Sequence, residues 1–220
     1  MNNQPSNQEF ILNVFEKGLV RGGDNLPYDP VKKYFYVQHP TEGWRVYLRA
    51  ACFIHEFPSK ENCIDPKKFI VVKRADKVAN GREWEPPKGQ MEWKDAAKLS
   101  NLPVLELLKQ NVRREVAEES RIQRIVGLRH TSLIFQGREK DYPPNTYFQY
   151  HIFQALVYPK EWIRASAELD WYRDHPKAFA RLKRDKREKD AIDWYSPSDH
   201  KLMGKWSPRL VAMYLNKFAK

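Results

Sequence analysis

Three glutamates in the middle of the 220-residue chain have the spacing that places carboxylates on one face of a helix. Glu115, Glu118 and Glu119 are separated by three residues and by one, so on a helix all three project toward a common point. Like charges this close repel one another, whereas hard divalent ions such as Mg²⁺ bind clustered carboxylate oxygens. The spacing therefore indicates a metal site, although the same residues also fit a solvated acidic face that Arg113 and Arg114 neutralise.

The acidic residues belong to a predicted helix. Proline is accepted in the first turn of a helix, so Asn101-Leu102-Pro103 marks a start, and the apolar residues that follow recur at helical spacing. These apolar residues are Val104, Leu105, Leu108, Val112 and Val116. We therefore predict a helix from about residue 101 to about Glu119.

Predicted strands precede and follow this helix. Five segments are rich in aromatic and β-branched residues and are bounded by turn signals, as strands are. They cover 34–38, 44–57, 68–74, 125–135 and 147–158. The last two flank a Pro143-Pro144-Asn145 turn, which favours a hairpin. With a final helix over 207–218, this order predicts an α+β fold in which a mixed sheet lies between helices.

Composition favours one globular domain with two peripheral segments. Hydrophobic residues make up 41% of the chain, which is enough to bury a core. Residues 1–33 contain glycine and proline turn signals around a short apolar patch, so we predict an N-terminal arm there and the domain over 34–220. Residues 161–190 predict a basic helical segment that is interrupted near Pro176.

Several classes of protein are disfavoured. The longest uninterrupted apolar run, 210–215, is far shorter than the roughly 20 residues of a membrane-spanning helix. The polar N-terminus lacks a secretory signal, and two cysteines with six scattered histidines give neither a disulfide framework nor a zinc spacing. A cytoplasmic location is therefore predicted. The net charge of +11 attracts polyanions such as nucleic acid, nucleotides and inositol phosphates without choosing among them.

A longer pattern surrounds the acidic helix. Gly89 lies in a proline-glycine loop, W-E-P-P-K-G-Q-M-E over 84–92, and Glu106 is followed seven residues later by R-E-V-A-E-E-S-R-I, which begins at Arg114. Together these residues resemble the Nudix box, G-x5-E-x7-R-E-U-x-E-E-x-G-U, in which U is aliphatic. From Glu106 to Ile122 the spacing matches position for position.

The match has two departures. Sixteen residues separate Gly89 from Glu106 where the motif has five, which predicts an insertion at about 91–102. Insertions in surface loops cost little stability, and this one leaves the carboxylates of the helix untouched. The last glycine of the motif is Arg121 here. A left-handed residue is expected at that point, where a residue other than glycine costs about 1 kcal/mol.

The resemblance implies a Nudix-like α/β/α sandwich and a Nudix hydrolase: Mg²⁺- or Mn²⁺-dependent hydrolysis of a diphosphate linked to another moiety, with water as the nucleophile. It also implies that Glu106 and Arg114 brace the helix by an ion pair. Chemistry supports the metal, because ions shared between carboxylates and phosphates neutralise the diphosphate and lower the pKa of a bound water. The implied metal ligands are Glu115, Glu118, Glu119 and the carbonyl of Gly89.

A fourth acid is needed as a general base or an additional ligand. The segment that begins at Glu188 resembles the acid-then-aromatic stretch of decapping Nudix enzymes, in which a glutamate precedes a tryptophan, here Trp194, by six residues. Glu188 is therefore the candidate base. The alternative is a charge that balances Lys186, Arg187 and Lys189 at a solvated helix end.

Two features bear on the substrate. The loop over 84–89 is similar to the W-x-x-P-K-G loop of mRNA-decapping enzymes and some dinucleoside polyphosphate hydrolases, which implies that Lys88 approaches phosphates as a point charge; otherwise it is a surface lysine in a turn. Arg173, Lys177, Arg181 and Arg184 recur at helical spacing and predict a basic stripe. An RNA backbone fits such a stripe, and so does a merely solvated charged helix.

The predicted function is hydrolysis of an RNA 5′ cap or 5′ polyphosphate, as in mRNA decapping, with Lys88, Arg181 and Arg184 binding the RNA. One alternative is a hydrolase of small substrates, either dinucleoside polyphosphates or diphosphoinositol polyphosphates. Another is a non-catalytic RNA-binding module with a Nudix fold. The intact carboxylates of the helix argue against this last alternative, because such a module has no need of them.

Overall fold

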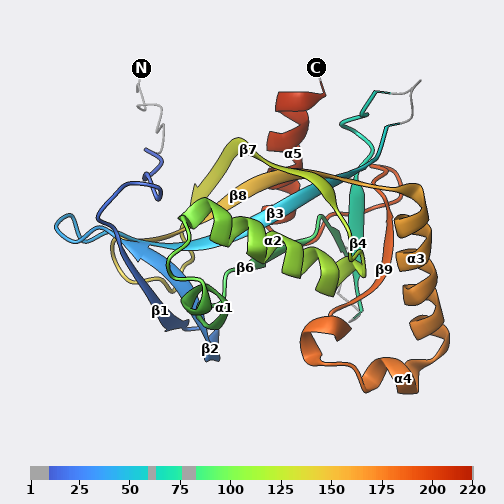
Figure 1. Cartoon of the computed structure of the whole chain (residues 1–220), viewed down its shortest axis with the longest axis horizontal. Helices are drawn as coiled ribbons and strands as arrows, with labels where there is room; N and C mark the ends of the chain where they lie inside the picture. Colours follow the sequence, from blue (N-terminus) through green and yellow to red (C-terminus); the bar gives the residue numbers. More distant parts are fainter. Residues whose placement is uncertain (1–9, 59–62, 76–82, 220) are drawn as a thin grey trace, which may run out of the picture.

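A six-stranded mixed sheet forms the centre of the computed structural model, which describes residues 10–58, 63–75 and 83–219 (Figure 1). The strand order is β1-β2-β3-β8-β7, and β6 pairs with β3. β3 and β8 are parallel, whereas the other neighbours are antiparallel, so the predicted mixed sheet is confirmed. The strands are β1 Val20–Leu26, β2 Asp29–Gln38, β3 Arg45–Glu56, β6 Lys88–Gln90, β7 Val126–Gly137 and β8 Thr146–Val157.

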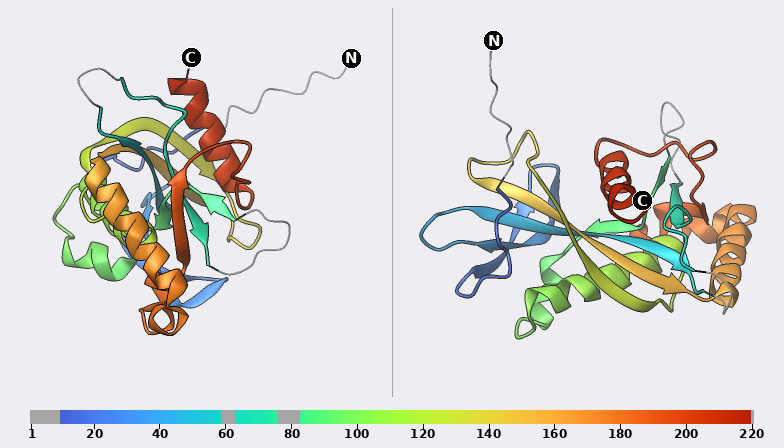
Figure 2. Two further views of the ribbon diagram at one scale, coloured as in Figure 1. Left: turned by 90° about the vertical axis from the view of Figure 1, so that its right-hand side faces the viewer. Right: turned by 90° about the horizontal axis from the view of Figure 1, so that it is seen from above.

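Strand β3 contributes to a hydrophobic core on each face of this sheet, because successive side chains of a strand point to opposite faces. Leu48 belongs to the core that contains residues of α2 (Val104–Ser120), and Phe53 belongs to the core that contains residues of α5 (Trp206–Phe218). Figure 2 shows these two helices on opposite sides of the sheet. The α+β arrangement of a mixed sheet between helices is thus the predicted one.

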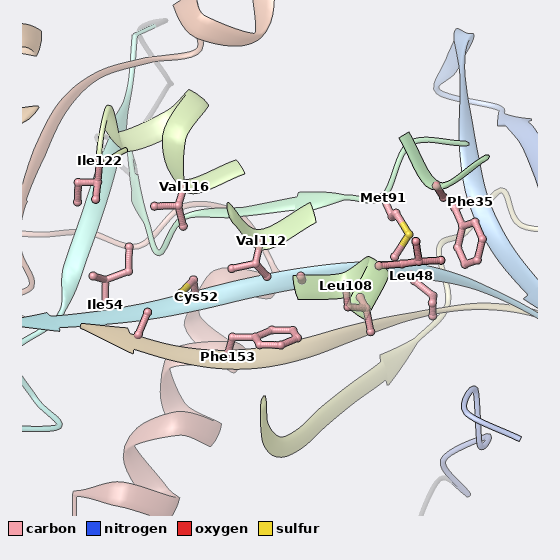
Figure 3. Close-up of a cluster of buried hydrophobic side chains, with 14 of the residues drawn as sticks. Phe35, Leu48, Cys52, Ile54, Met91, Leu108, Val112, Val116, Ile122 and Phe153 are labelled. Atoms are coloured by element: carbon pink, nitrogen blue, oxygen red, sulfur yellow. The ribbon is translucent and has the colours of Figure 1, made fainter. Parts of the chain in front are cut away.

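Apolar residues at helical spacing fix α2 on the sheet. Leu108, Val112 and Val116 are buried in the same cluster as Phe153 of β8 (Figure 3). Fully burying a side chain of this kind stabilises the fold by about 1.5–3 kcal/mol. The apolar stripe therefore sets the rotation of the helix about its axis, and with it the direction in which the glutamates of the helix point.

A second sheet has three strands in the order β5-β4-β9. Its strands are β4 Ile70–Arg74, β5 Trp84–Glu85 and β9 Lys189–Trp194. The sequence pattern does not indicate β9, because three of its six residues are charged. The helix α3 (Pro159–Asp174) packs against it, with the rings of Trp162 and Trp194 stacked at a centroid distance of 5.7 Å.

The structure differs from the predicted N-terminal arm over residues 20–33. These residues form β1 and the first part of β2, which pair as a hairpin. Gly22 and Gly23 resemble a turn signal, but both lie inside β1 because the strand packs closely: a Cβ on Gly22 would lie 2.4 Å from the Tyr36 ring, and one on Gly23 would lie 2.1 Å from the Trp93 side chain. Residues 1–9 of the predicted arm lie outside the described residues.

Two further segments differ from their predictions. The predicted insertion contains a short helix, α1 (Trp93–Lys98). The basic segment is divided among α3, α4 (Pro176–Ala180) and the 3-10 helix η1 (Arg184–Arg187). The predicted interruption near Pro176 is confirmed, but the predicted stripe from Arg173 to Arg184 does not lie on one helix. Pro176 begins α4, which ends at Ala180, and the extended backbone of Lys183 separates it from η1. None of the helices in the described parts of the chain is long and apolar enough to span a membrane.

Candidate active site

Acidic residues from three separate parts of the chain line one small cavity of about 150 Å³. Most of the site residues that the sequence predicted and that line this cavity belong to α2 and β6. Glu188 instead follows η1 and is exposed. The structure therefore brings together the carboxylates of the helix, the loop glycine and the candidate base. The lining residues that the sequence pattern singled out are Lys88, Gly89, Arg114, Glu115, Glu118, Glu119 and Glu188.

Glu115 lies directly against the backbone of Gly89. A Cβ at Gly89 would lie 1.9 Å from Cδ of Glu115, so the carboxylate occupies the space that any larger residue would need. Burial raises the pKa of Glu115 to about 8; Glu119 and Glu118 act in the same direction, and Arg114 opposes them. Glu115 is thus a buried acid whose charged form a nearby cation would stabilise.

Arg114 lies between carboxylates of the helix. Its Nη1 donates to Oε2 of Glu118 at 2.6 Å, and its Nη2 donates to Oε1 of Glu115 at 2.5 Å. Its Nε lies 3.3 Å from Oδ2 of Asp95 in α1. Burial alone would lower the pKa of Arg114, but the surrounding carboxylates outweigh burial and raise it above its ordinary value. Arg114 therefore neutralises part of the acidic face.

Glu106 does not have its predicted place. It lies in the first turn of α2, where its Oε1 accepts a hydrogen bond from Lys109 at 2.7 Å, and roughly 12 Å of helix separates it from Arg114. The predicted Glu106–Arg114 ion pair is therefore wrong, and Asp95 takes its place. Asp95 follows Gly89 at the G-x5 spacing of the motif, which is the sequence signal that identifies it. The extra residues accordingly lie after Asp95.

Glu119 belongs to a buried charge network that no motif in the sequence indicates. Nζ of Lys189 lies 3.1 Å from Oε1 of Glu119 and also contacts Glu85, whose Oε2 lies 2.7 Å from Nζ of Lys88. Burial by itself raises the pKa of Glu85, but the two lysines outweigh it and bring the pKa to about 2. Glu85 lies within the matched loop and Lys189 directly follows Glu188, yet no spacing rule marks them as partners.

Lys88 is held by this network through two different groups. Its backbone N–H donates to Oε2 of Glu119 at 2.9 Å, which ties β6 to α2. Its ammonium group pairs with Glu85, and only 15% of its side chain is exposed. The phosphate contact implied by the resemblance stays a prediction, and it requires the ammonium group to be shared with Glu85.

The carboxylate oxygens at the cavity fit a hard divalent cation, and Gly89, whose carbonyl the resemblance implies as a ligand, also lines it. In the ranges that the structure describes, no three His, Cys, Asp or Glu side chains converge as a metal-binding group. The reason is that Arg114 lies between Glu115 and Glu118, while Lys189 pairs with Glu119. The protein's own cations therefore neutralise the carboxylates that would hold the ion.

Arg121 connects the end of α2 to η1. It is the left-handed C-cap of the helix, with φ 64°, as the position of the motif's last glycine predicts. Its side chain donates to the carbonyl of Glu118 at 2.9 Å and to the carbonyl of Lys186. These bonds offset the strain of about 1 kcal/mol that a residue other than glycine brings to this conformation.

Arg181 and Arg184, the predicted RNA contacts, are exposed and lie at the end of α4 and the start of η1. Neither is among the residues that line the cavity. However, Asp185 and Glu188 do line it, so the two arginines lie within a few residues of the cavity wall. The role of the arginines in binding RNA stays a prediction.

No family model matches the chain, and no curated protein matches its sequence. Solved structures resemble it weakly. The Nudix domain of Shewanella oneidensis NrtR complexed with ADP ribose is 11% identical, with a TM-score of 0.46 over 83% of this chain and 94% of that one. A Nudix hydrolase from Nitrosomonas europaea is 12% identical, with a TM-score of 0.43 over 79% and 88%. The C. elegans Ap4A hydrolase is 15% identical, with a TM-score of 0.41 over 79% and 97%. Similarities this weak leave the functional argument to the site residues.

Proposed function

We propose that this cavity hydrolyses a diphosphate linkage and that the protein is a Nudix-type hydrolase. The observation that supports this most is the meeting of Glu115, Glu118 and Glu119 with the distant Glu188 at one cavity. A solvated acidic face requires neither a fourth acid from another segment nor a glycine whose missing Cβ makes room for a carboxylate. Gly89 supplies that room for Glu115.

The chemistry divides among the residues at the cavity. When bound, Mg²⁺ or Mn²⁺ would neutralise the non-bridging diphosphate oxygens and lower the pKa of a water molecule. Glu115, Glu118 and Glu119 would hold the ion, and Glu188 would accept the proton of the attacking water or serve as a further ligand. As the new bond from water oxygen to phosphorus forms, the bond from that phosphorus to the bridging oxygen breaks. Two phosphorylated products result.

A second cavity suggests where the rest of the substrate lies. It has a volume of about 520 Å³ and shares all three residues of β6 with the carboxylate cavity. Tyr28 and Tyr150 also line it, and the ring of Tyr28, which is 53% exposed, offers a surface on which a nucleobase can stack. The charged residues there are of both signs, with the carboxylates of Glu139 and Asp141 beside Arg49, Lys88 and Lys140, whereas a highly phosphorylated inositol calls for positive charge alone. A nucleotide substituent therefore fits this cavity better.

We further propose that the natural substrate is an RNA with a 5′ cap or a 5′ polyphosphate. The exposed Arg184 directly precedes Asp185 of the cavity wall, and the exposed Arg181 lies four residues before Asp185, so an RNA chain that leaves the cavity on this side meets positive charge. The net charge of +11 favours the same class of ligand. A dinucleoside polyphosphate is the second candidate, because it fits the two adjoining cavities without using the basic segment.

A substrate panel tests this proposal. The purified protein is incubated with Mn²⁺ or Mg²⁺ and, in separate reactions, with capped RNA, free cap dinucleotide, diadenosine tetraphosphate and a diphosphoinositol polyphosphate, and the products are resolved. We expect capped RNA to be cleaved at the highest kcat/KM. Faster cleavage of the diadenosine compound would favour the second candidate, and binding of RNA without cleavage of any compound would indicate a binding module.

A further inference from the structure

The segment of residues 184–188, called the η1 segment below, is joined to β2 by an ion pair at the cavity wall. Nζ of Lys32 lies 2.9 Å from Oδ1 of Asp185 and 2.9 Å from Oε1 of Glu92. Lys32 belongs to β2, whereas Asp185 belongs to η1, 153 residues later. All three of these residues line the cavity that contains the carboxylates of α2.

This bridge is more protected than an ordinary surface ion pair. The exposed fractions of the side chains are 28% for Lys32, 32% for Asp185 and 6% for Glu92, so water screens the charges only in part. Burial by itself would lower the pKa of Lys32, but hydrogen bonds to the two carboxylates outweigh it and raise the pKa above its ordinary value. Lys32 is therefore charged at neutral pH.

Further hydrogen bonds attach the η1 segment: Nη1 of Arg187 donates to the carbonyl of Ala180 at 3.1 Å, and others involve the backbone of the segment. Arg121 donates to the carbonyl of Lys186, and the N–H of Ala75 donates to the carbonyl of Glu188 at 2.9 Å. Within the described parts of the chain, no side chain forms a hydrogen bond with the carboxylate of Glu188. The backbone of the segment therefore sets where this carboxylate lies, and the Lys32–Asp185 pair is the side-chain contact that fastens that backbone to β2.

We infer that Lys32, acting through Asp185, is a positioning residue that holds the η1 segment so that Glu188 stays at the carboxylates of α2. This inference rests on the proposed function, in which Glu188 acts on the attacking water or the ion. The competing role for Lys32 is direct contact with a substrate phosphate. The two roles of Lys32 differ in what they require of Asp185. If Lys32 positions the η1 segment, the carboxylate of Asp185 is as necessary as the lysine. If Lys32 binds a substrate phosphate, the carboxylate only competes with that phosphate for the lysine.

A double-mutant cycle separates these roles. Lys32→Met and Asp185→Asn should each lower kcat roughly 10-fold with little change in KM, because a small displacement of a catalytic group is costly. The double variant should be no slower than either single variant, since the two residues act as one unit. Lys32→Arg should recover most of the activity. Lys33→Met is the matched control on β2 and should behave as wild type, because Lys33 is exposed and does not line the cavity.

Amide hydrogen exchange provides a readout that does not depend on turnover. Exchange at 184–188 should be faster in Lys32→Met and in Asp185→Asn than in wild type, while exchange in α2 stays unchanged. Unchanged exchange at 184–188 would overturn the inference, as would faster exchange with wild-type kcat in both variants. A rise in KM confined to Lys32→Met, with Asp185→Asn fully active, would assign Lys32 to phosphate binding instead. Failure of the proposed function would be recognised separately, because the wild-type protein would be inactive or the Glu188→Gln variant fully active. Either result would overturn this inference together with the proposed function.

Discussion

The acidic face of α2 and the η1 segment both supply acids to the cavity, but different forces hold them. α2 is fixed by apolar residues such as Leu108 and Val116, which are no more than 1% exposed. η1 itself contains no buried residue. Its segment is held by hydrogen bonds and by an ion pair, which reach it from Lys32 of β2 and from Arg121 at the end of α2. The core positions one set of acids, and polar contacts position the other.

Because of this difference, variants on α2 should test binding of the ion, and variants near the η1 segment should test the position of the base, Glu188. Charge changes on the face of α2 should alter the chemistry while the backbone stays in place, because the apolar side of the helix is untouched. Changes near the η1 segment should alter the position of Glu188 as well as the local charge. We therefore expect charge changes on α2 to lower kcat strongly through electrostatics alone. Changes at the η1 segment should lower kcat less and should also increase local motion of the backbone.

The largest effect is expected from Glu118→Gln. This change removes one ligand charge at nearly constant volume, so kcat should fall roughly 1000-fold, as loss of several kcal/mol of metal-assisted stabilisation implies. The melting temperature should change little, because the apolar residues that hold α2 on the sheet are unchanged. Glu106→Gln is the matched control on the same helix, since Glu106 pairs with Lys109 away from the cavity. Turnover of Glu118→Gln close to wild type would refute the metal assignment.

The next effect is expected from Glu188→Gln, which removes the candidate base. We expect kcat to fall roughly 100-fold with little change in KM, because general base catalysis typically contributes this much. Steady-state kinetics with the preferred substrate measures both constants. Asp170→Asn, a change of the same kind at an exposed residue of α3, should have no effect. A wild-type kcat in Glu188→Gln would place the base elsewhere.

A smaller effect on kcat should show whether Asp95 or Glu106 is the carboxylate that pairs with Arg114. Asp95→Asn removes a carboxylate next to Arg114 and should lower kcat roughly 3- to 10-fold, as loss of a group that orients a site residue does. Glu106→Gln should leave kcat unchanged. If Glu106→Gln is instead the more damaging of the two, the ion pair implied by the sequence motif forms in solution and the structural assignment to Asp95 is wrong.

The smallest effect on catalysis is expected from the pair Arg181→Ala and Arg184→Ala. These changes should weaken binding to a capped RNA of about 30 nucleotides and flatten its salt dependence by roughly 0.7 for each phosphate that is no longer neutralised, because fewer counterions are released. Cleavage of free cap dinucleotide should hardly change. The control pair Lys67→Ala and Lys201→Ala removes the same charge from other exposed positions. An equal salt slope for both pairs would rule out the η1 region as an RNA-binding surface.

The sequence predicted what depends on regular local structure. The helix of residues 104–120 and the strands on either side follow from periodicity, and the shared face of Glu115 and Glu118 follows from the geometry of a helix. Long-range packing decided the rest. Gly22 and Gly23 lie in a strand because distant side chains fill the space a Cβ would take, and spacing within the sequence cannot show this.

The buried ion pairs are the main feature of the site that the sequence did not predict. Glu85 and Lys189 lie far apart in the sequence and meet only because β5 and β9 flank the same strand, β4, and each residue alone reads as an ordinary surface charge. Asp95 was missed for a different reason. The motif's spacing from Gly89 identifies it, but its spacing back from Arg114 favours Glu106, and only the positions of α1 and α2 decide between them.

The most direct test of the central claim is Mn²⁺ binding to the wild-type protein and to Glu118→Gln, measured from the decrease of the free Mn²⁺ signal in electron paramagnetic resonance. The titration is run with and without a non-hydrolysable cap analogue, and Glu106→Gln serves as the control. The acidic face of α2 predicts binding in the wild type and the control that is at least about tenfold tighter than in Glu118→Gln. Equal affinity in all three proteins, or no binding to any of them, would contradict the account.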